Sequence, residues 1–204
     1  ISRSTASGEV AGGDKVGGLV GSNFAGEIKL SVATGSVVVQ SPQTTVPRAG
    51  GLVGGNFRGG VVNQAYAKSA VSGGGSGARI GGLVGENFNT TGSNPSRIFN
   101  SYASGSVSGS DRVGGLVGGN FRESRVVDSY WDTQATGQST SDGSATGLTT
   151  TEMQGTAAIE NMNLTFGETW QTVSGDYPEL IALADLDADS DEGSQSDPES
   201  AQFE

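Results

Sequence analysis

A block of alternating apolar and small residues occurs four times along this chain of 204 residues. Its copies are VGGLVGSNF (16–24), AGGLVGGNF (49–57), IGGLVGENF (80–88) and VGGLVGGNF (113–121). The leucines at the centre of the blocks, Leu19, Leu52, Leu83 and Leu116, set a period of 31 to 33 residues. Self-similarity at this period is typical of stacked repeats, in which each copy buries its apolar face only against its neighbours.

Each repeat divides into three short extended segments. The first is the GGLVG block; the second follows the Asn-Phe pair and covers 28–33, 61–67, 98–103 and 126–131. The third is short and rich in Ser and Gly, at 35–38, 69–73 and 105–109. No helical period is visible, and short runs bounded by Gly, Ser and Asn are typical of strands and turns. The pattern therefore predicts an all-β fold, a β-solenoid whose coils pair through parallel strands.

The Asn-Phe pair predicts two columns of equivalent side chains that run from coil to coil. The asparagines would form a ladder of amide hydrogen bonds beside stacked phenylalanines, and both columns would help to fill the interior. The alternative is a ligand-binding strip, but a structural ladder that stabilises the turns is favoured. The ladder residues are Asn23, Asn56, Asn87, Asn120, Phe24, Phe57, Phe88 and Phe121.

The repeats divide the chain into three expected parts. Residues 1–15 align with the back half of a repeat, so we expect a half repeat and four copies over 1–130, with the parent protein continuing upstream. Residues 131–183 depart from the repeat and are assigned to a capping segment, because an array must close its open apolar end. Residues 184–204 form an acidic linker or disordered tail. Insertions at 39–47, 72–78 and 89–96 are expected to form loops on one side of the stack.

Charge separates the array from its tail. Ten of the 22 acidic residues lie from Asp176 onward and no Lys or Arg follows Arg125, which leaves 12 acidic and 11 basic residues in 1–175. The near-neutral array lacks the basic surface that phosphate binding needs, so nucleic acid is not an expected partner. No run of about 18 apolar residues occurs, so no membrane insertion of this segment is expected.

Candidate chemistry is sparse. The chain has no Cys and no His, which excludes a thiolate nucleophile and a His-based metal site. Asp111, Asp128 and Asp132 could converge as a glycosidase pair would, but no acid recurs with a partner at a consistent spacing, so no enzyme is predicted. Asp187, Asp189 and Asp191 form a weak candidate for a Ca²⁺ loop, because the following glycine, Gly193, stands one place later than such a loop requires. No other cofactor is expected.

The repeated G-L-V-G with Asn-Phe, followed by NSYASGSVSG at 100–109, resembles the GLUG repeat family. The closing SYWDTQATGQS (129–139), with the later GLTTTEM and Tyr-Pro, is similar to the ends of such arrays. The resemblance covers roughly residues 1–183. It implies a repeat of large secreted or surface-anchored prokaryotic proteins, such as filamentous-haemagglutinin-like adhesins and the non-catalytic regions of IgA-peptidase-like enzymes.

These observations favour a non-catalytic extracellular module, a stalk or adhesion scaffold at the cell surface. Its partners would be other domains of the parent protein and, through the corner loops, a glycan or a protein of a host or neighbouring cell. A second hypothesis is a self-assembling subunit of a fibre, sheath or viral spike, since exposed strand edges pair readily. A third is a carbohydrate-active enzyme built on a β-helix.

Overall fold

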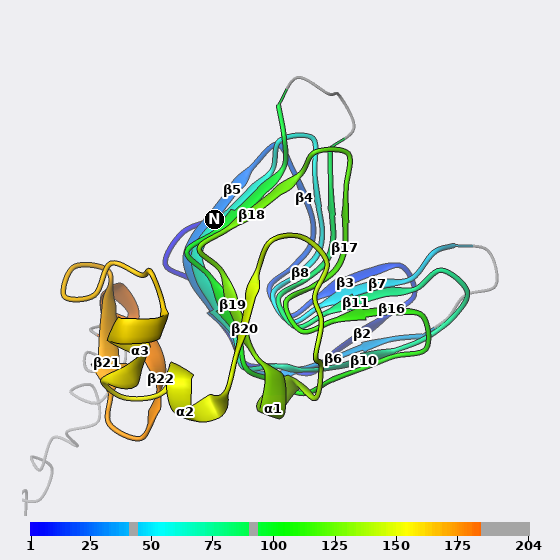
Figure 1. The fold of residues 1–204 in the computed structure, drawn as a ribbon. Coiled ribbons are helices and arrows are strands. Elements are labelled where there is room, and N and C mark those ends of the chain that lie inside the picture. Colours follow the sequence, from blue (N-terminus) through cyan, green and yellow to red (C-terminus); the bar gives the residue numbers. More distant parts are fainter. Residues whose placement is uncertain (41–44, 90–93, 185–204) are drawn as a thin grey trace, which may run out of the picture.

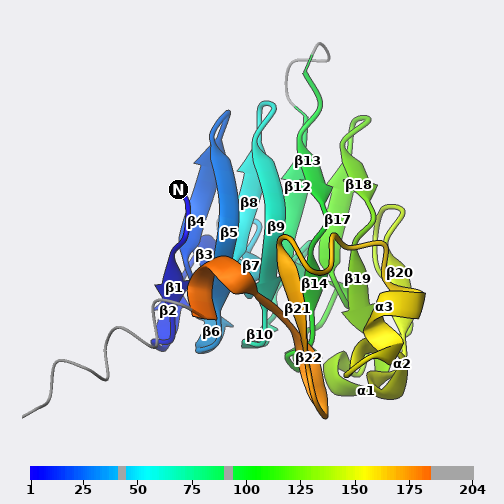
Figure 2. The same ribbon diagram turned by 90° about the vertical axis from the view of Figure 1, so that its left-hand side faces the viewer.

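The computed structural model describes residues 1–40, 45–89 and 94–184, and these form the predicted β-solenoid (Figures 1 and 2). Val20 pairs with Val53, Val53 with Val84, and Val84 with Val117, so one repeat makes one coil and the register advances through three turns. The coil-to-coil pairing is parallel, as expected. The prediction of an all-β solenoid is therefore confirmed.

Four parallel sheets run along the stack in the described residues. The eight-stranded sheet contains β1 (Thr5–Ala6), β5 (Glu27–Ala33), β9 (Val61–Ala67), β13 (Arg97–Phe99), β14 (Tyr102–Ala103), β18 (Arg125–Val127), β19 (Tyr130–Asp132) and β20 (Thr146–Leu148). The β6 sheet contains β2 (Val10–Gly12), β6 (Ser36–Val39), β10 (Ala70–Gly73) and β15 (Val107–Ser108). The β7 sheet contains β3 (Lys15–Gly17), β7 (Arg48–Gly50), β11 (Arg79–Gly81) and β16 (Arg112–Gly114). The β8 sheet contains β4 (Val20–Phe24), β8 (Val53–Phe57), β12 (Val84–Phe88) and β17 (Val117–Phe121).

The GGLVG block is a corner between two strands, not one segment. In the second coil β7 ends at Gly50 and β8 begins at Val53, so the first of the three expected segments is in fact two strands. The corner can stack tightly because Gly51 carries no side chain: a Cβ there would stand 2.2 Å from the carbonyl oxygen of Gly82 in the next coil. The backbone bonds continue through the corner, where Leu52 N–H donates to the Leu83 carbonyl at 3.0 Å.

A column of left-handed residues bends the eight-stranded sheet. Arg3, Leu30, Gln64, Asn100 and Asp128 occupy equivalent places and have φ between 43° and 51°, although none is glycine. The bend explains why Ile98 and Tyr102, which strict alternation would place on one face, lie in different clusters: Ile98 packs inside the solenoid and Tyr102 packs outside it.

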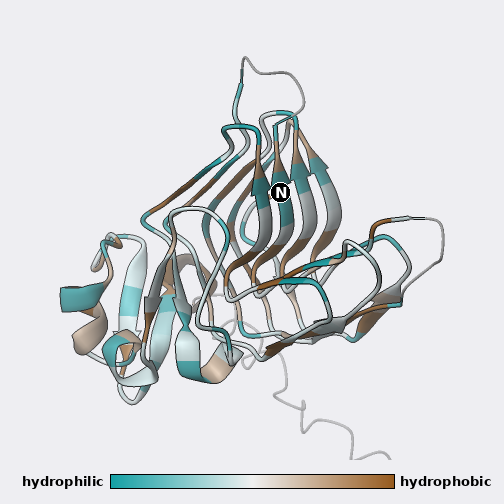
Figure 3. Ribbon diagram, turned by 45° about the vertical axis from the view of Figure 1, so that its right-hand side comes forward, coloured by the Kyte–Doolittle hydropathy of each residue, from teal (hydrophilic) through white to brown (hydrophobic). Residues whose placement is uncertain are grey.

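Two apolar cores fill the coils. The larger contains the fully buried leucines of the corner column together with Ile28, Val62, Ile98 and Val126. The smaller lies between the β6 and β7 sheets and contains Val37, Val71 and Ile80. Figure 3 shows the same hydropathy recurring at equivalent places of successive coils, as expected for a stack that buries each coil against the next.

The last coil is closed by residues that follow β19. Trp131 stands in register with Ala33, Ala67 and Ala103, and its indole fills the end of the larger core. The chain then forms α1 (Thr133–Thr136) and crosses the edge of β17, where the Ser141 hydroxyl accepts a bond from Val117 N–H at 2.9 Å. Residues 133–148 therefore cover the open strands of the fourth coil.

Residues 149–184 pack against the flank of the stack instead of its end. They comprise α2 (Thr150–Met153), α3 (Ala157–Asn161), the hairpin of β21 (Trp170–Val173) and β22 (Asp176–Leu180), and the helical residues 181–184 (Figure 2). Helix α2 begins at the N-cap Thr149, whose side chain and that of Glu152 form a capping box. We call this segment the flank clamp.

The insertions map to two corners of the coil, not to one. Those of the first two copies lie between β6 and β7 and between β10 and β11, whereas that of the third copy lies between β12 and β13 (Figure 1). These connections join different pairs of sheets, so the insertions belong to two different corners of the coil.

Ala25, which follows Phe24, provides a test of the strained turns. It is exposed and has a φ of 54°, a conformation that costs a non-glycine residue about 1–2 kcal/mol. We expect Ala25→Gly to leave stability unchanged or raise it by up to about 1 kcal/mol, because the relief of strain outweighs the added entropy of the unfolded chain. Ala70→Gly, at an exposed strand position, should instead lower stability by about 0.5–1 kcal/mol. Urea denaturation of both variants checks this, and equal losses would contradict it.

Candidate functional site

The asparagine column forms a chain of side-chain hydrogen bonds through four coils. Asn23 Nδ2 donates to Asn56 Oδ1 at 2.8 Å, Asn56 to Asn87 at 2.9 Å, and Asn87 to Asn120 at 2.8 Å. Each amide also reaches a carbonyl of the turn in its own coil, as Asn56 does with Gly60 at 2.9 Å. Asn56 and Asn87 are fully buried. The amides therefore hold the turn of each coil and join it to the next coil.

The phenylalanines point outward, in contrast to the expectation that they help to fill the interior. They follow the buried asparagines along each strand, and the alternation of a strand places the next side chain on the opposite face. The rings form two pairs: Phe24 with Phe57 at 5.1 Å between centroids, and Phe88 with Phe121 at 6.2 Å. Phe24 is 56% exposed, whereas Phe57 is 6% exposed. The column is an aromatic row on the outside of the β8 sheet.

A basic row runs parallel to the aromatic row on the neighbouring β7 sheet. Lys15, Arg48, Arg79 and Arg112 are register partners in successive coils. The Arg79 guanidinium lies 4.7 Å from the centroid of the Phe121 ring, and that of Arg112 lies 5.3 Å from it. Two further arginines at the turns, Arg58 and Arg122, lie over Phe24 and Phe88. We call the basic and aromatic rows together the basic-aromatic face.

One buried acid, Glu86, is built into this face. Glu86 stands where the other coils have Ser22, Gly55 and Gly119, and it is 2% exposed. Its carboxylate accepts hydrogen bonds from Arg79 of its own coil and from Arg48 of the preceding coil. A buried carboxylate is stable only when it is paired and hydrogen-bonded, and these two arginines satisfy it.

The two rows border a hollow of about 360 Å³. Its walls are Lys15, Arg48 and Arg79 on one side and Phe24, Phe57 and Phe88 on the other. Figure 1 shows the two sheets diverging from the glycine corner, with the β8 sheet upright and the β7 sheet extending sideways, so this hollow lies in the angle between them. An angle lined by cations and aromatic rings is suited to a ligand that carries both negative charge and an apolar surface.

The flank clamp is held by aromatic packing and buried hydroxyl groups. The Trp170 ring lies against Tyr66 and Tyr102, with centroids 5.9 and 5.7 Å away. The Tyr102 hydroxyl donates to the Pro178 carbonyl at 2.5 Å, and burial raises the pKa of Tyr102 well above its usual value. The Tyr177 hydroxyl donates to Asp132 at 2.6 Å, and burial and this carboxylate raise the pKa of Tyr177. Both tyrosines stay neutral at ordinary pH and act as structural donors.

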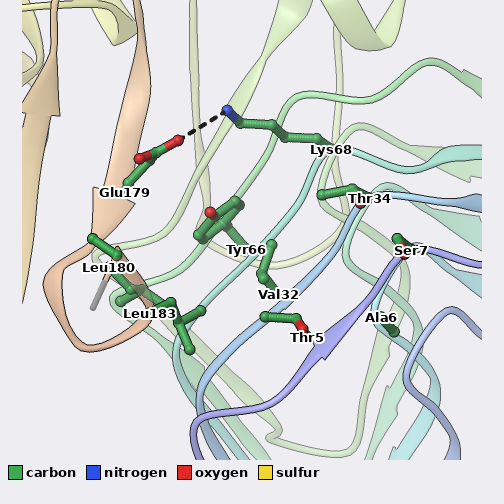
Figure 4. Close-up of a pocket in the computed structure, with 11 residues that line it drawn as sticks. Thr5, Ala6, Ser7, Val32, Thr34, Tyr66, Lys68, Glu179, Leu180 and Leu183 are labelled. Carbon is green, nitrogen blue, oxygen red and sulfur yellow. Dashed lines mark ion pairs between the residues drawn. The ribbon is translucent and has the colours of Figure 1, made fainter. Parts of the chain in front are cut away.

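A second hollow, of about 340 Å³, lies between the clamp and the first two coils (Figure 4). It occurs where the tyrosine column ends at the smaller Val32, which is in register with Tyr66. Lys68 borders it and forms ion pairs with Asp176 at 3.2 Å and Glu179 at 3.9 Å. The charged side chains that border this hollow, Lys68 and Glu179, therefore neutralise each other. We interpret the hollow as a packing gap beneath the flank clamp.

The three acids considered as a glycosidase pair have separate structural partners. Asp132 caps α1 by accepting bonds from Gln134 and Ala135, and it also binds Tyr177. Asp128 accepts a bond from Asn163, and Asp111 accepts one from the Gly77 N–H at 2.7 Å. Within residues 1–40, 45–89 and 94–184, no group of three acidic residues is arranged to hold a metal ion.

The weak calcium candidate, Asp187, Asp189 and Asp191, lies outside the described residues, as does the acidic tail from residue 185. Over the part of the chain that the structure describes, no helix is long and apolar enough to cross a membrane.

The basic row was not recognised from the sequence, although its signal is present there. A basic residue stands four positions before each of the leucines that define the period. Charge totals obscured it, because acids elsewhere make residues 1–175 nearly neutral. The surface on which the flank clamp packs cannot be inferred from the sequence, because the left-handed bend that turns Tyr66 and Tyr102 outward uses no glycine.

The asparagine ladder can be tested by comparing an interior rung with a terminal one. Asn56→Ala removes two amide-to-amide bonds and leaves buried groups of both neighbours unpaired, so we expect a loss of about 2–4 kcal/mol in the free energy of unfolding. Asn23→Ala removes one such bond at the end of the ladder, and we expect it to lower the free energy of unfolding by about 1–2 kcal/mol. Chemical denaturation measures both; a larger loss for Asn23→Ala would contradict a cooperative ladder.

Comparison with known proteins agrees with the repeat. Residues 76–108 match a family model described as the GLUG motif. An 82-residue segment is 45% identical to Halomucin of Haloquadratum walsbyi; the alignment covers 39% of this chain and 1% of Halomucin, so the chain corresponds to a small part of that protein. No solved structure matches. The matched motif extends from the residues before β11 to β15, so one motif forms one coil of the solenoid. The chain carries the GLUG motif that its sequence resembles.

Proposed function

We propose that this chain is a non-catalytic spacer module of a larger extracellular surface protein, in which stacked coils hold other domains or binding loops away from the cell. The observation that carries the proposal is the continuity of the stack. Four parallel sheets and the amide column pass without interruption from the first coil to the fourth. Similarity to a small segment of Halomucin supports a role as one part of a much longer chain.

The mechanical argument follows from the direction of the hydrogen bonds. In a β-solenoid the strand-to-strand bonds run along the stack, and each added coil lengthens the rod by about 4.8 Å. The buried amide column adds a second set of bonds with the same direction. A load along the rod is thus shared among many bonds in each coil, and length is set by the number of repeats.

Adhesion through the corner loops and self-assembly into a fibre remain alternatives with distinct requirements. Loop-mediated adhesion needs the insertions between β6 and β7 and between β12 and β13 to contact a partner. Self-assembly needs strand edges that another molecule can extend, yet the edge of β17 is already occupied by Ser141 and Asp142. Because residues 133–148 cover the open strands of the fourth coil, the structure favours a stack that ends there over one that polymerises through this coil.

The spacer role predicts that a coil can be added without loss of the fold. Residues 20–52 form one register unit, since Val20 pairs with Val53. Inserting a second copy of 20–52 after Leu52 therefore preserves the strand register between successive coils. We expect a monomer of unchanged thermal stability or higher whose longest dimension grows by about 4.8 Å. Size-exclusion chromatography with light scattering and small-angle X-ray scattering, over a range of protein concentrations, measures both quantities.

The matched control inserts the same residues in scrambled order, which adds the same mass without the register. It should lose the cooperative unfolding transition. Collapse of the duplicated array, or concentration-dependent growth of the wild-type chain into long species, would contradict the spacer proposal, and the second result would favour a self-assembling subunit.

A further inference from the structure

We infer that the basic-aromatic face binds an acidic polysaccharide that lies along the stack. The inference builds on the proposed extracellular role and adds a ligand class and a site to it. The site is a face of the coils, not a corner loop.

The first argument is charge. The row of Lys15, Arg48, Arg79 and Arg112 carries four cations, and the acids paired with it are Asp14 and Glu86. Among the ion pairs of the described residues, none involves Arg112. The face therefore keeps an excess of two positive charges on a chain whose net charge is −11. A concave surface of one sign concentrates the potential and attracts ligands of the opposite sign.

The second argument is donor capacity. The Arg112 side chain is exposed and takes part in none of the ion pairs of the described residues, so its donors face solvent. Arginine matches a carboxylate with paired donors in a fixed plane, and its ring contacts hold that plane in place before a ligand arrives. Arg79 and Arg112 both lie over the Phe121 ring, so their orientations are set by the protein.

The third argument is shape and period. A sugar ring offers an apolar C–H face to an aromatic ring and its charged group to a neighbouring cation, and this face provides both in parallel rows. The rows repeat once per coil, about every 4.8 Å. A linear polymer with a carboxylate on each sugar can engage several coils at once, and linked contacts of this kind raise the overall affinity. Phe24, the most exposed ring, provides the stacking surface at one end.

Glu86 gives the inference a distinctive consequence. Its carboxylate occupies both Arg48 and Arg79 from within the face and so competes with an anionic ligand. Replacing it with the isosteric neutral side chain should strengthen binding, whereas damage to the fold would weaken it. The direction of this effect separates a ligand-binding role of the arginines from a purely structural one.

The experiment is calorimetric titration of the purified chain with a short oligogalacturonate, compared with its methyl ester, which has the same sugar rings without the charge. We expect binding of the acid and at least about tenfold weaker binding of the ester, with affinity falling as salt rises. Arg112→Gln should weaken binding about threefold to tenfold and reduce the salt slope, as loss of one charge contact does. Phe24→Leu, which keeps the apolar bulk but removes the ring, should also weaken it.

Arg97→Gln is the matched control, because Arg97 is an exposed arginine on the eight-stranded sheet, away from this face, and it should leave the affinity unchanged. Glu86→Gln should bind about tenfold more tightly, because two arginines lose their internal partner. Circular dichroism verifies that each variant is folded. If Glu86→Gln does not fold, the affinities of Arg112→Gln and Phe24→Leu test the inference instead.

Equal binding of acid and ester, or weaker binding by folded Glu86→Gln, would overturn the inference. Binding of single-stranded DNA as tightly as the uronate would also overturn it, in favour of a general polyanion surface. If the chain does not bind the uronate, the result of the coil-duplication experiment is unaffected. Failure of this inference is therefore distinguishable from failure of the spacer proposal.

Discussion

Each coil of this protein is stable only because its backbone bonds to the next one. An isolated repeat has few internal contacts, so its strands must find their partners one repeat away, at the register that joins Val20 to Val53 and Val53 to Val84. That constraint forces equivalent side chains into columns. A side chain in the interior therefore contacts its own counterparts, and every column must be chemically compatible with itself.

The columns meet this requirement in different ways. Leucine packs against leucine at the corner, and asparagine can bond to asparagine because an amide is both donor and acceptor. Glycine at the corner allows a backbone approach that no side chain would permit. A cation column has no such internal solution, since like charges repel. The basic row is instead placed outside the core, where aromatic rings and the single buried Glu86 reduce the repulsion. The same constraint that builds the core thus creates the charged face.

Much of this arrangement could be predicted from the repeat itself. The period predicts a stack of repeats that pair through parallel strands, and the recurrence of Asn23 and its equivalents predicts a ladder of amide hydrogen bonds. The outward direction of the phenylalanines and the fourth strand per coil were not foreseen. The fourth strand depends on the corner at Gly51–Leu52, and the outward position of Tyr66 and Tyr102 depends on left-handed residues such as Gln64; local sequence reveals neither. The path of residues 149–184 along the flank depends on packing between distant segments, and no local pattern encodes it.

Side-chain amide hydrogen exchange, followed by NMR, tests the central claim most directly. If the coils are joined by a buried amide ladder, the side-chain NH₂ protons of Asn56 and Asn87 should exchange orders of magnitude more slowly than those of the exposed Asn161. Similar, fast exchange at all three residues in the folded protein would show that the ladder is not formed in solution and would contradict this account.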